Sequence, residues 1–218
     1  MSIKLNAQSG GSVALDAPTQ TTGSADVTLK LPVADGSAGQ ALKTAGSGNL
    51  SFGSAGLSYG VTDLDAWAIS SAYTAASGSN IMDTNWYRFA TATDTHFTQL
   101  GGAMTQSSGI FTCPSTGFWV MEFTLGGYNI SDNSGTYFGG QVFFSNDSGS
   151  NYDRISTAYT NMMGSSDHGA LLMKSYVDVT DTSTCRAKFH TNISASKTIF
   201  GDGDEMRSGV VFTRIGDT

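Results

Sequence analysis

Apolar and polar positions alternate with a period of two along much of this chain, a pattern typical of β-strands with one buried face. The clearest run is 118–125, in which Trp119, Met121, Phe123 and Leu125 form one wholly apolar alternate set. A proline and a Ser-Thr-Gly break precede this run, and proline cannot donate a hydrogen bond to a ladder. We therefore expect a short strand before the break and a core strand of an antiparallel sandwich after it.

Similar runs follow one another at intervals of about eight to twelve residues, the spacing typical of a sandwich or jelly roll. No amphipathic helical run of convincing length interrupts them, so we expect an all-β fold. The segment 75–80 is turn-rich, and the last run, 209–215, is expected to lie inside a sheet. The remaining expected strands are 67–69, 86–89, 95–99, 137–144, 152–159, 170–179 and 185–190.

The first part of the chain has a different composition from the rest. Residues 1–58 contain one aromatic residue, Phe52, whereas residues 59–218 contain twenty-two. Such a segment cannot build a conventional core alone, although its aliphatic residues alternate as in strands. We expect an extended β-rich attachment arm over 1–58 that pairs with other chains, and a jelly-roll knob domain over 59–218. The arm residues expected to make that attachment are Val13, Leu15, Val27, Leu29, Leu31 and Val33.

The segment 109–119 carries a resemblance to a known family. Its pattern, Gly-x-Phe-Thr-Cys-Pro-x-x-Gly followed by two aromatic residues, resembles the strand-turn-strand signature of the trimeric jelly-roll family of the complement-q globular head and its tumour-necrosis-factor-like relatives. The resemblance implies three jelly rolls packed around a threefold axis, and the surplus of aromatic residues agrees with it. The residues expected in the trimer contact or the core are Phe111, Phe118, Trp119, Phe123, Phe143 and Phe144.

A second resemblance lies in the arm. Residues 12–18, 27–32 and 35–52 are similar to the N-terminal segment of many marine bacteriophage fibre and virion-surface proteins. This resemblance implies a virion structural protein, assembled as a homotrimer in the host cytoplasm. It also implies that the arm contacts other virion proteins, such as a tail adaptor, a nozzle or the capsid.

Charge and hydropathy narrow the range of partners. Of the net charge of −7, residues 61–218 carry the whole excess, with eight Lys and Arg against fifteen Asp and Glu. An acidic domain disfavours nucleic-acid binding, because contacts to phosphate need positive charge. No apolar stretch approaches the length of a membrane span, so we expect no membrane insertion. The start of the chain lacks the long apolar segment of a secretory signal, which disfavours a secreted lectin-like head.

Residue types that carry chemistry are sparse. His96, His168 and His190 have no metal-ligand spacing with one another or with other ligands, and no nucleophile motif appears, so we expect no enzyme and no catalytic residues. We expect no cofactor and a solvated acidic turn over residues 201–205. The alternative is a calcium site, because Asp202, Asp204 and Glu205 supply three carboxylates within four residues.

The two cysteines, Cys113 and Cys185, both lie in alternating, strand-like runs. In a reducing compartment we expect two buried thiols that pack as small apolar side chains, with a disulfide as the alternative. Two cysteines are too few for a structural zinc site.

The function expected first is a tail fibre or tail-associated trimeric knob that binds a host surface glycan or protein. Loops at the end of a sandwich vary without disturbing the core, so they are the expected contacts. The alternatives are a capsid decoration or head-fibre protein and, second, a polysaccharide depolymerase, which needs a carboxylate pair in a groove. The candidate receptor-loop residues are Tyr128, Asn129, Asp132, Asn146, Asp147 and Asn151.

Overall fold

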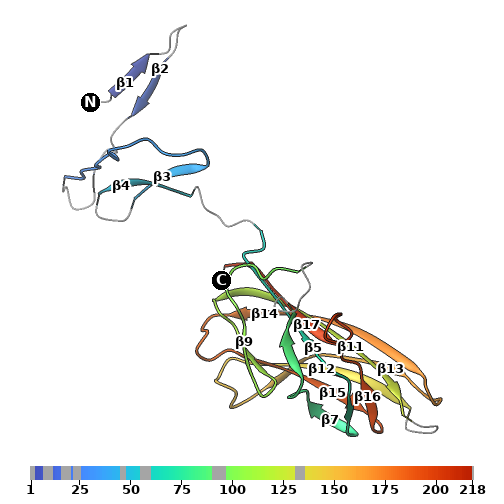
Figure 1. The fold of residues 1–218 in the computed structure, drawn as a ribbon. Coiled ribbons are helices and arrows are strands. Elements are labelled where there is room, and N and C mark those ends of the chain that lie inside the picture. Colours follow the sequence, from blue (N-terminus) through green and yellow to red (C-terminus); the bar gives the residue numbers. More distant parts are fainter. Residues whose placement is uncertain are drawn as a thin grey trace. The chain divides into compact units, whose positions relative to one another are not determined.

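The structure is a computed structural model that describes residues 3–6, 12–15, 21, 26–44, 48–54, 60–89, 97–130 and 136–217. These residues form strands and no α-helix, so none of them forms a helix able to cross a membrane. The chain divides into two compact units, Met1–Leu57 and Ser58–Thr218 (Figure 1).

The first unit contains two antiparallel hairpins. Strand β1 (Ile3–Asn6) pairs with β2 (Ser12–Leu15), and β3 (Gln40–Thr44) pairs with β4 (Leu50–Ser54). Our expectation that the strand around Val13 lacks a partner within the arm is therefore wrong, because β1 supplies one. The side chains of β1 and β2 lie outside the described residues.

The expected strand over residues 27–33 does not form. This segment is extended coil apart from an isolated bridge between Lys30 and Asn49, and its aliphatic side chains are exposed, from 59% at Leu29 to 108% at Val33. Pairing is limited to Lys30, whose backbone hydrogen-bonds to Gly48 and Leu50 at 2.8 Å, so the alternation extends no ladder.

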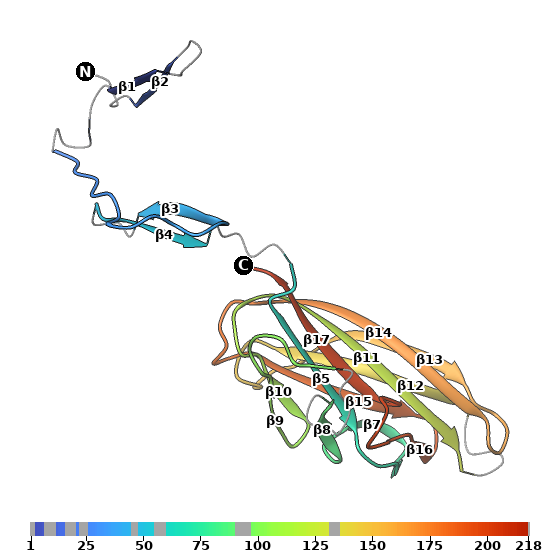
Figure 2. The same ribbon diagram turned by 45° about the horizontal axis from the view of Figure 1, so that its top comes forward.

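The second unit is a sandwich of two antiparallel sheets (Figures 1 and 2). The six-stranded sheet has the order β13-β12-β15-β10-β9, and β7 also pairs with β15. Its strands are β7 (Gly78–Ile81), β9 (Thr105–Ser107), β10 (Ile110–Thr112), β12 (Tyr137–Ser145), β13 (Asp153–Asn161) and β15 (Arg186–Ile193). The seven-stranded sheet has the order β6-β16-β11-β17-β5-β8, and β14 also pairs with β11. Its strands are β5 (Asp63–Ile69), β6 (Tyr73–Ala75), β8 (Trp86–Arg88), β11 (Gly117–Asn129), β14 (His168–Val179), β16 (Lys197–Ile199) and β17 (Gly209–Gly216).

Strand β11 organises the seven-stranded sheet. It pairs with β14 along its length and with β17 and β16 on its other side. Trp119, Met121, Phe123 and Leu125 are all buried in the core, as the alternation predicts. The core strand expected from the sequence is therefore confirmed.

Phe111, on β10, lies at the centre of the aromatic core. Its ring centroid is 5.1 Å from Trp86, 5.2 Å from Phe212, 5.5 Å from Trp67 and 5.6 Å from Phe189. Three of these pairs are edge-to-face, an arrangement that aromatic quadrupoles favour. One side chain thus joins both sheets.

Several short strands differ from the sequence expectation. The segment 75–80 is not simply a turn, because β6 pairs with β16 and β7 pairs with β15. The expected strand 95–99 does not form in its described part, 97–99, and the neighbouring Leu100 makes only an isolated bridge to Leu64. Strand β17 lies between β11 and β5, which confirms that the last strand is inside the sheet.

Candidate functional site

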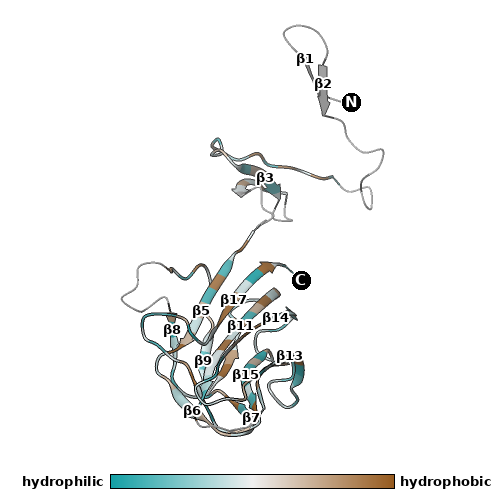
Figure 3. Ribbon diagram, turned by 90° about the vertical axis from the view of Figure 1, so that its right-hand side faces the viewer, coloured by the Kyte–Doolittle hydropathy of each residue, from teal (hydrophilic) through white to brown (hydrophobic). Residues whose placement is uncertain are grey.

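The second unit has two ends, and the chain enters it at one of them. Asp63 at the start of β5 pairs with Arg214 near the end of β17, so the chain enters and leaves the unit at one end. We call this the proximal end. Strands β6 and β7 lie at the opposite end, which we call the distal end (Figure 3).

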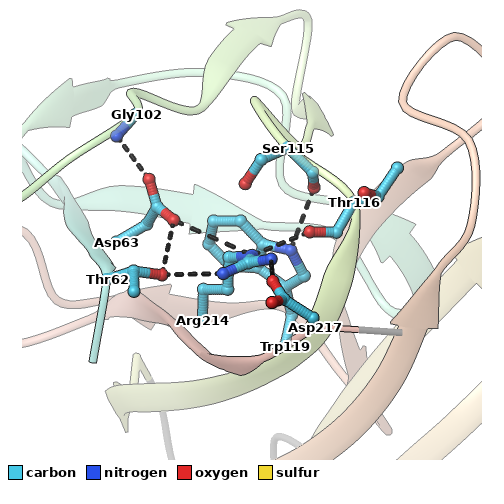
Figure 4. Close-up of polar contacts among 8 residues, drawn as sticks. All are labelled: Thr62, Asp63, Gly102, Ser115, Thr116, Trp119, Arg214 and Asp217. Carbon is cyan, nitrogen blue, oxygen red and sulfur yellow. Dashed lines mark hydrogen bonds and ion pairs between the residues drawn. The ribbon is translucent and has the colours of Figure 1, made fainter. Parts of the chain in front are cut away.

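Polar contacts centred on Arg214 hold the proximal end together (Figure 4). Its guanidinium donates to the backbone oxygen of Thr116 at 2.7 Å and to Thr62 Oγ1 at 2.9 Å. It also pairs with Asp217 and lies 3.9 Å from Asp63. The cluster joins the start of β5, the end of β17 and the loop before β11, so it fixes the point at which the chain enters.

A pocket of about 390 Å³ opens at the distal end, between β6, β7 and the turn that follows β7. Burial and the nearby Asp83 carboxylate raise the pKa of Tyr73, so its hydroxyl stays a hydrogen-bond donor. The Asn80 side chain is held by hydrogen bonds to the backbone oxygens of Ala76 and Ser77 at 2.9 and 3.1 Å. The full lining is Tyr73, Thr74, Ala75, Ala76, Asn80, Ile81, Asp83, Thr84 and Thr191.

One aromatic ring beside a carboxylate, an amide and several hydroxyls can bind a polyhydroxylated ligand such as a sugar. The ring offers an apolar face, and the polar groups offer donors and acceptors. The sequence analysis did not identify this pocket, because most of its residues come from β6 and β7. These strands are too short to show a recognisable alternation of apolar and polar residues.

A second, more apolar hollow of about 500 Å³ lies on the outer face of the seven-stranded sheet. Phe200 and His168 line it, with Arg207 and Gly126. Tyr128 stacks on Phe200 with ring centroids 5.7 Å apart, and the rings of His168 and Phe200 meet edge to face at 5.4 Å. A Cβ at Gly126 would lie 3.0 Å from the Phe200 ring, so the hollow depends on glycine there.

The predicted receptor-loop residues do not form one surface. Tyr128 is half-buried beside Phe200, and Asn129 is only 1% exposed. The Asn129 amide donates to the backbone oxygen of Gly164 at 2.8 Å and accepts from Lys197. Asn129 therefore holds the loop before β14 instead of facing solvent, which corrects its predicted role. Asp132 lies outside the described residues.

The other three receptor candidates lie near the proximal end. Ser148 donates to the backbone oxygen of Thr184, next to Cys185, at 2.9 Å. Asp147 accepts from the backbone of Asn151 at 2.9 Å and from its side chain at 2.6 Å, so the loop 146–151 closes on itself. Asp147 therefore caps its own turn.

The residues expected in the trimer contact or core separate into two groups. Phe111, Trp119 and Phe123 are buried in the core. Phe144 packs partly against the same core. Phe143 is half-buried on the outer face of the six-stranded sheet, with its ring centroid 4.5 Å from that of His190. Phe118 is 45% exposed.

The outer face of β14 carries large apolar side chains. Leu172 and Tyr176 are 67% and 66% exposed, whereas Met173 and Val177 between and after them are buried. Phe118 on the neighbouring β11 is on the same face, because it pairs with Asp178 of the exposed set. We call Phe118, Leu172 and Tyr176 the β14 apolar face. Leu172 and Tyr176 lie on β14, the edge strand of the described sheet, and Phe118 lies on the adjacent β11.

An arginine side chain is the electrostatic partner of the acidic loop near Asp202, the alternative site for calcium. Arg207 pairs with Glu205 and lies 3.4 Å from Asp202. Asp202 Oδ1 also accepts from the backbone of Asp204 at 2.9 Å. Over the part of the chain that the structure describes, no three His, Cys, Asp or Glu side chains group closely enough to hold a metal.

One serine and one histidine meet on the outer face of the six-stranded sheet. Ser79 Oγ donates to Gln141 Oε1 at 2.7 Å and lies 3.1 Å from His190 Nδ1. Burial and the charge of Lys188 lower the pKa of His190 to about 4, so its ring is neutral at pH 7. In this arrangement the Ser79 proton is directed to Gln141 and away from His190 Nδ1, whereas a nucleophile gives its proton to the base.

No protein-family model matches the chain, and no curated protein matches it. Among solved structures, the Eiger TNF from S. frugiperda is similar with a TM-score of 0.55 and 7% identity, covering 71% of this chain and 93% of that chain. The crystal structure of murine APRIL at pH 5.0 is similar with a TM-score of 0.51 and 6% identity, covering 70% and 98%. At these identities the likeness concerns the fold alone.

The second unit is therefore a tumour-necrosis-factor-like jelly roll, and the expected fold class is confirmed. The resemblance that rests on residues 109–119 identifies the fold correctly. The resemblance of the arm to phage proteins stays a prediction.

Proposed function

We propose that the chain is a bacteriophage virion protein, located on the virion after assembly in the host cytoplasm. In this proposal, the jelly roll is a trimeric knob of a tail fibre that binds a host surface glycan or protein. The first unit attaches the knob to other virion proteins. The binding role is carried by the distal pocket, because it lies at the end opposite the point where the chain enters the knob.

The exposed aliphatic side chains of the first unit support an attachment role. Val27, Leu29 and Leu31 are 59% to 74% exposed in a segment that is not part of a strand. An extended segment with alternate apolar side chains can add to the sheet edge of another protein, where the backbone pairs and the side chains are buried. A neighbouring virion protein is the proposed partner.

The β14 apolar face supports self-association. Its tyrosine and phenylalanine are residue types that interface cores favour, and they are exposed with a leucine on the same side of a regular sheet, where Lys174 lies between Leu172 and Tyr176. A second copy of the chain offers the same rigid, apolar face as a partner. In a trimer around one axis, the β14 apolar face of each copy would be covered by a neighbouring copy.

Two linked experiments test the proposed function. Immunogold labelling of purified particles with an antibody to the knob should mark the tail. Label over the shell would favour the capsid-decoration alternative, and particles without label would contradict a virion role.

The purified protein, carrying a detectable label, should also adsorb to susceptible bacterial cells. The double variant Asp83→Ala with Thr84→Ala should weaken this adsorption about tenfold or more, because the hydroxyls of a bound sugar lose hydrogen-bond partners. Asp153→Ala, an exposed change on β13, is the matched control.

A further inference from the structure

The two cysteines of the chain face each other across the six-stranded sheet. Cys113 follows β10 and Cys185 precedes β15, and these strands are antiparallel with Phe111 opposite Ala187. Continuing that register by two residues brings Cys113 opposite Cys185. Their Sγ atoms are 3.1 Å apart, and the two residues are 5% and 1% exposed. Both are thiols in this structure.

This placement meets the geometric requirements of a cross-strand disulfide. Directly opposed residues of antiparallel strands have Cα atoms about 4.5–5.5 Å apart, within the range that disulfides span. A bond of about 2.05 Å needs the two sulfur atoms to approach by about 1 Å more, which side-chain rotation can supply. The neighbouring backbone already holds both residues, because Cys185 N donates to the backbone oxygen of Asp181 at 3.1 Å and Phe111 lies in the aromatic core.

We propose that Cys113 and Cys185 are a disulfide-forming pair that closes when the protein passes from reducing to oxidising surroundings. The inference does not depend on the proposed virion role. With glutathione disulfide as oxidant, the thiolate of one cysteine attacks the glutathione S–S bond, forms a mixed disulfide and releases one glutathione thiolate. The second cysteine attacks the protein sulfur of that mixed disulfide and releases the second glutathione. Two thiol protons and two electrons leave the protein in total.

Cys185 is the thiol better suited to react first. The hydrogen bond between the two thiols is the main cause that lowers the pKa of Cys185, and a backbone hydrogen bond at Cys113 and the charge of Arg186 lower it further. Hydrogen bonding to Cys185 and burial raise the pKa of Cys113. The thiolate is the nucleophile in thiol–disulfide exchange, so the difference favours Cys185.

Closure would join two segments that are 72 residues apart in the sequence. A cross-link of that span removes much conformational freedom from the unfolded chain and so stabilises the folded one. The bond would lie beside the loop 146–151, in which the Ser148 backbone N–H donates a hydrogen bond to the backbone oxygen of Thr184. Cys113 itself directly precedes Pro114. The stabilised region is therefore the proximal end of the sandwich.

The test uses the full chain, purified with reductant and then treated with glutathione disulfide in two ways: folded, and during refolding from denaturant. We expect a mass loss of about 2 Da without retained glutathione and a Tm rise of about 10 °C. A peptide map made without reductant should contain the Cys113 and Cys185 peptides joined to each other. Cys113→Ser and Cys185→Ser should show neither the mass loss nor the rise.

The outcomes separate clearly. An intramolecular linkage after either treatment supports the proposal, and reduction should restore the lower Tm. Two free thiols after both treatments would overturn it, and so would disulfides formed only between chains. If the Ser variants fold poorly, Cys113→Ala with Cys185→Ala gives a second oxidant-insensitive reference with apolar side chains of smaller volume.

Discussion

Individual buried residues of the jelly roll are fixed by polar contacts as well as by packing. Asp65 on β5 has a fully buried side chain that accepts from Arg88 Nε at 3.1 Å, from Trp67 Nε1 at 3.1 Å and from the backbone of Met104 at 2.9 Å. Arg88 also lies over the Trp67 ring, with Cζ 4.7 Å from the centroid. The cluster satisfies a buried carboxylate by joining β5, β8 and the loop before β9.

We predict that removing one partner of this ion pair is strongly destabilising. Arg88→Leu leaves the buried Asp65 without its positive partner, and such changes cost about 3–5 kcal/mol. Urea denaturation measures the change in the free energy of unfolding. The control is Lys174→Ala, which breaks the exposed pair with Glu122 and should cost less than about 1 kcal/mol. Equal effects of the two changes would contradict the prediction.

The pKa of Asp147 gives a prediction about pH. Hydrogen bonds from the Asn151 backbone, the Ser145 hydroxyl and the Asn151 side chain lower the pKa of Asp147 to about 2. An unfolded Asp titrates near about 3.9, so the folded pKa is the lower one. The stabilisation is therefore complete above about pH 4 and is lost as the pH falls through about 2.

Carboxyl carbon NMR should show the Asp147 midpoint near 2, and Asn151→Ala should raise it. A midpoint near that of an unfolded Asp, with no response to Asn151→Ala, would show that the loop contacts do not form in solution. The sequence could predict the self-capping role of this Asp, because Asx turns are local. It could not predict Asn129, whose partners Gly164 and Lys197 are distant in sequence.

At the scale of elements, long strands were predictable, whereas among the short ones only those marked by large apolar residues, such as β8 and β10, were. The runs that became β11, β12, β14 and β17 have enough alternating residues to identify a buried face. Strands such as β6 and β16 have three residues each, so alternation carries almost no information about them. Both walls of the distal pocket come from such short strands, which is why the sequence did not reveal it.

The arm shows the reverse error. Alternation over residues 27–33 indicated a strand, but a strand needs a hydrogen-bonding neighbour, and periodicity does not report whether one exists. The β2 residues Val13 and Leu15 have such a neighbour in β1, which the alternation of β2 alone does not reveal. A strand needs both an alternating pattern and a neighbouring strand to pair with. In the first unit, residues 27–33 have the pattern without a paired strand, whereas β1 and β2 pair.

A two-residue turn decides whether β9 and β10 can pair. Ser108 and Gly109 both have positive φ, 49° and 78°, as the first and second positions of tight hairpin turns often require. A Cβ on Gly109 would lie 2.3 Å from the backbone oxygen of Met82. Because β10 holds Phe111 in the core, strain at this turn is transmitted to the aromatic cluster.

We predict that Gly109→Ala lowers the free energy of unfolding of the second unit by at least about 1–3 kcal/mol, because alanine is strained at this positive φ and its Cβ clashes with Met82. Gly203→Ala is the matched control, since no atom lies within 4 Å of a Cβ there. Thermal unfolding followed by circular dichroism compares the two. A Gly109→Ala protein as stable as the control would mean that the turn does not have this geometry.

At the scale of the whole molecule, the described part of the jelly roll exposes large apolar side chains on its outer face. In the β14 apolar face they alternate with the exposed Lys174 and Asp178 of the same strand. An exposed cluster of large apolar side chains on a regular sheet usually marks an interaction site. The proposed trimer would bury it.

We predict that the full chain is a trimer in solution and that Leu172→Asp with Tyr176→Asp makes it monomeric, because buried charges without partners oppose association. Size-exclusion chromatography with light scattering gives the mass of each. Thr157→Asp, an exposed change on β13, should leave the trimer intact. A monomeric wild type, or a double variant that stays trimeric, would contradict the assignment of this face.

The pairing of β5 with β17 along most of both strands bears on how the knob would respond to mechanical force. Tension applied at Asp63 and resisted at the distal pocket runs along the axis of β5. The hydrogen bonds to β17 are perpendicular to that axis, so they are loaded in shear, all at once, instead of opening one after another. In the proposed fibre, a domain held in this way would resist detachment of its first strand while a bound cell pulls on it.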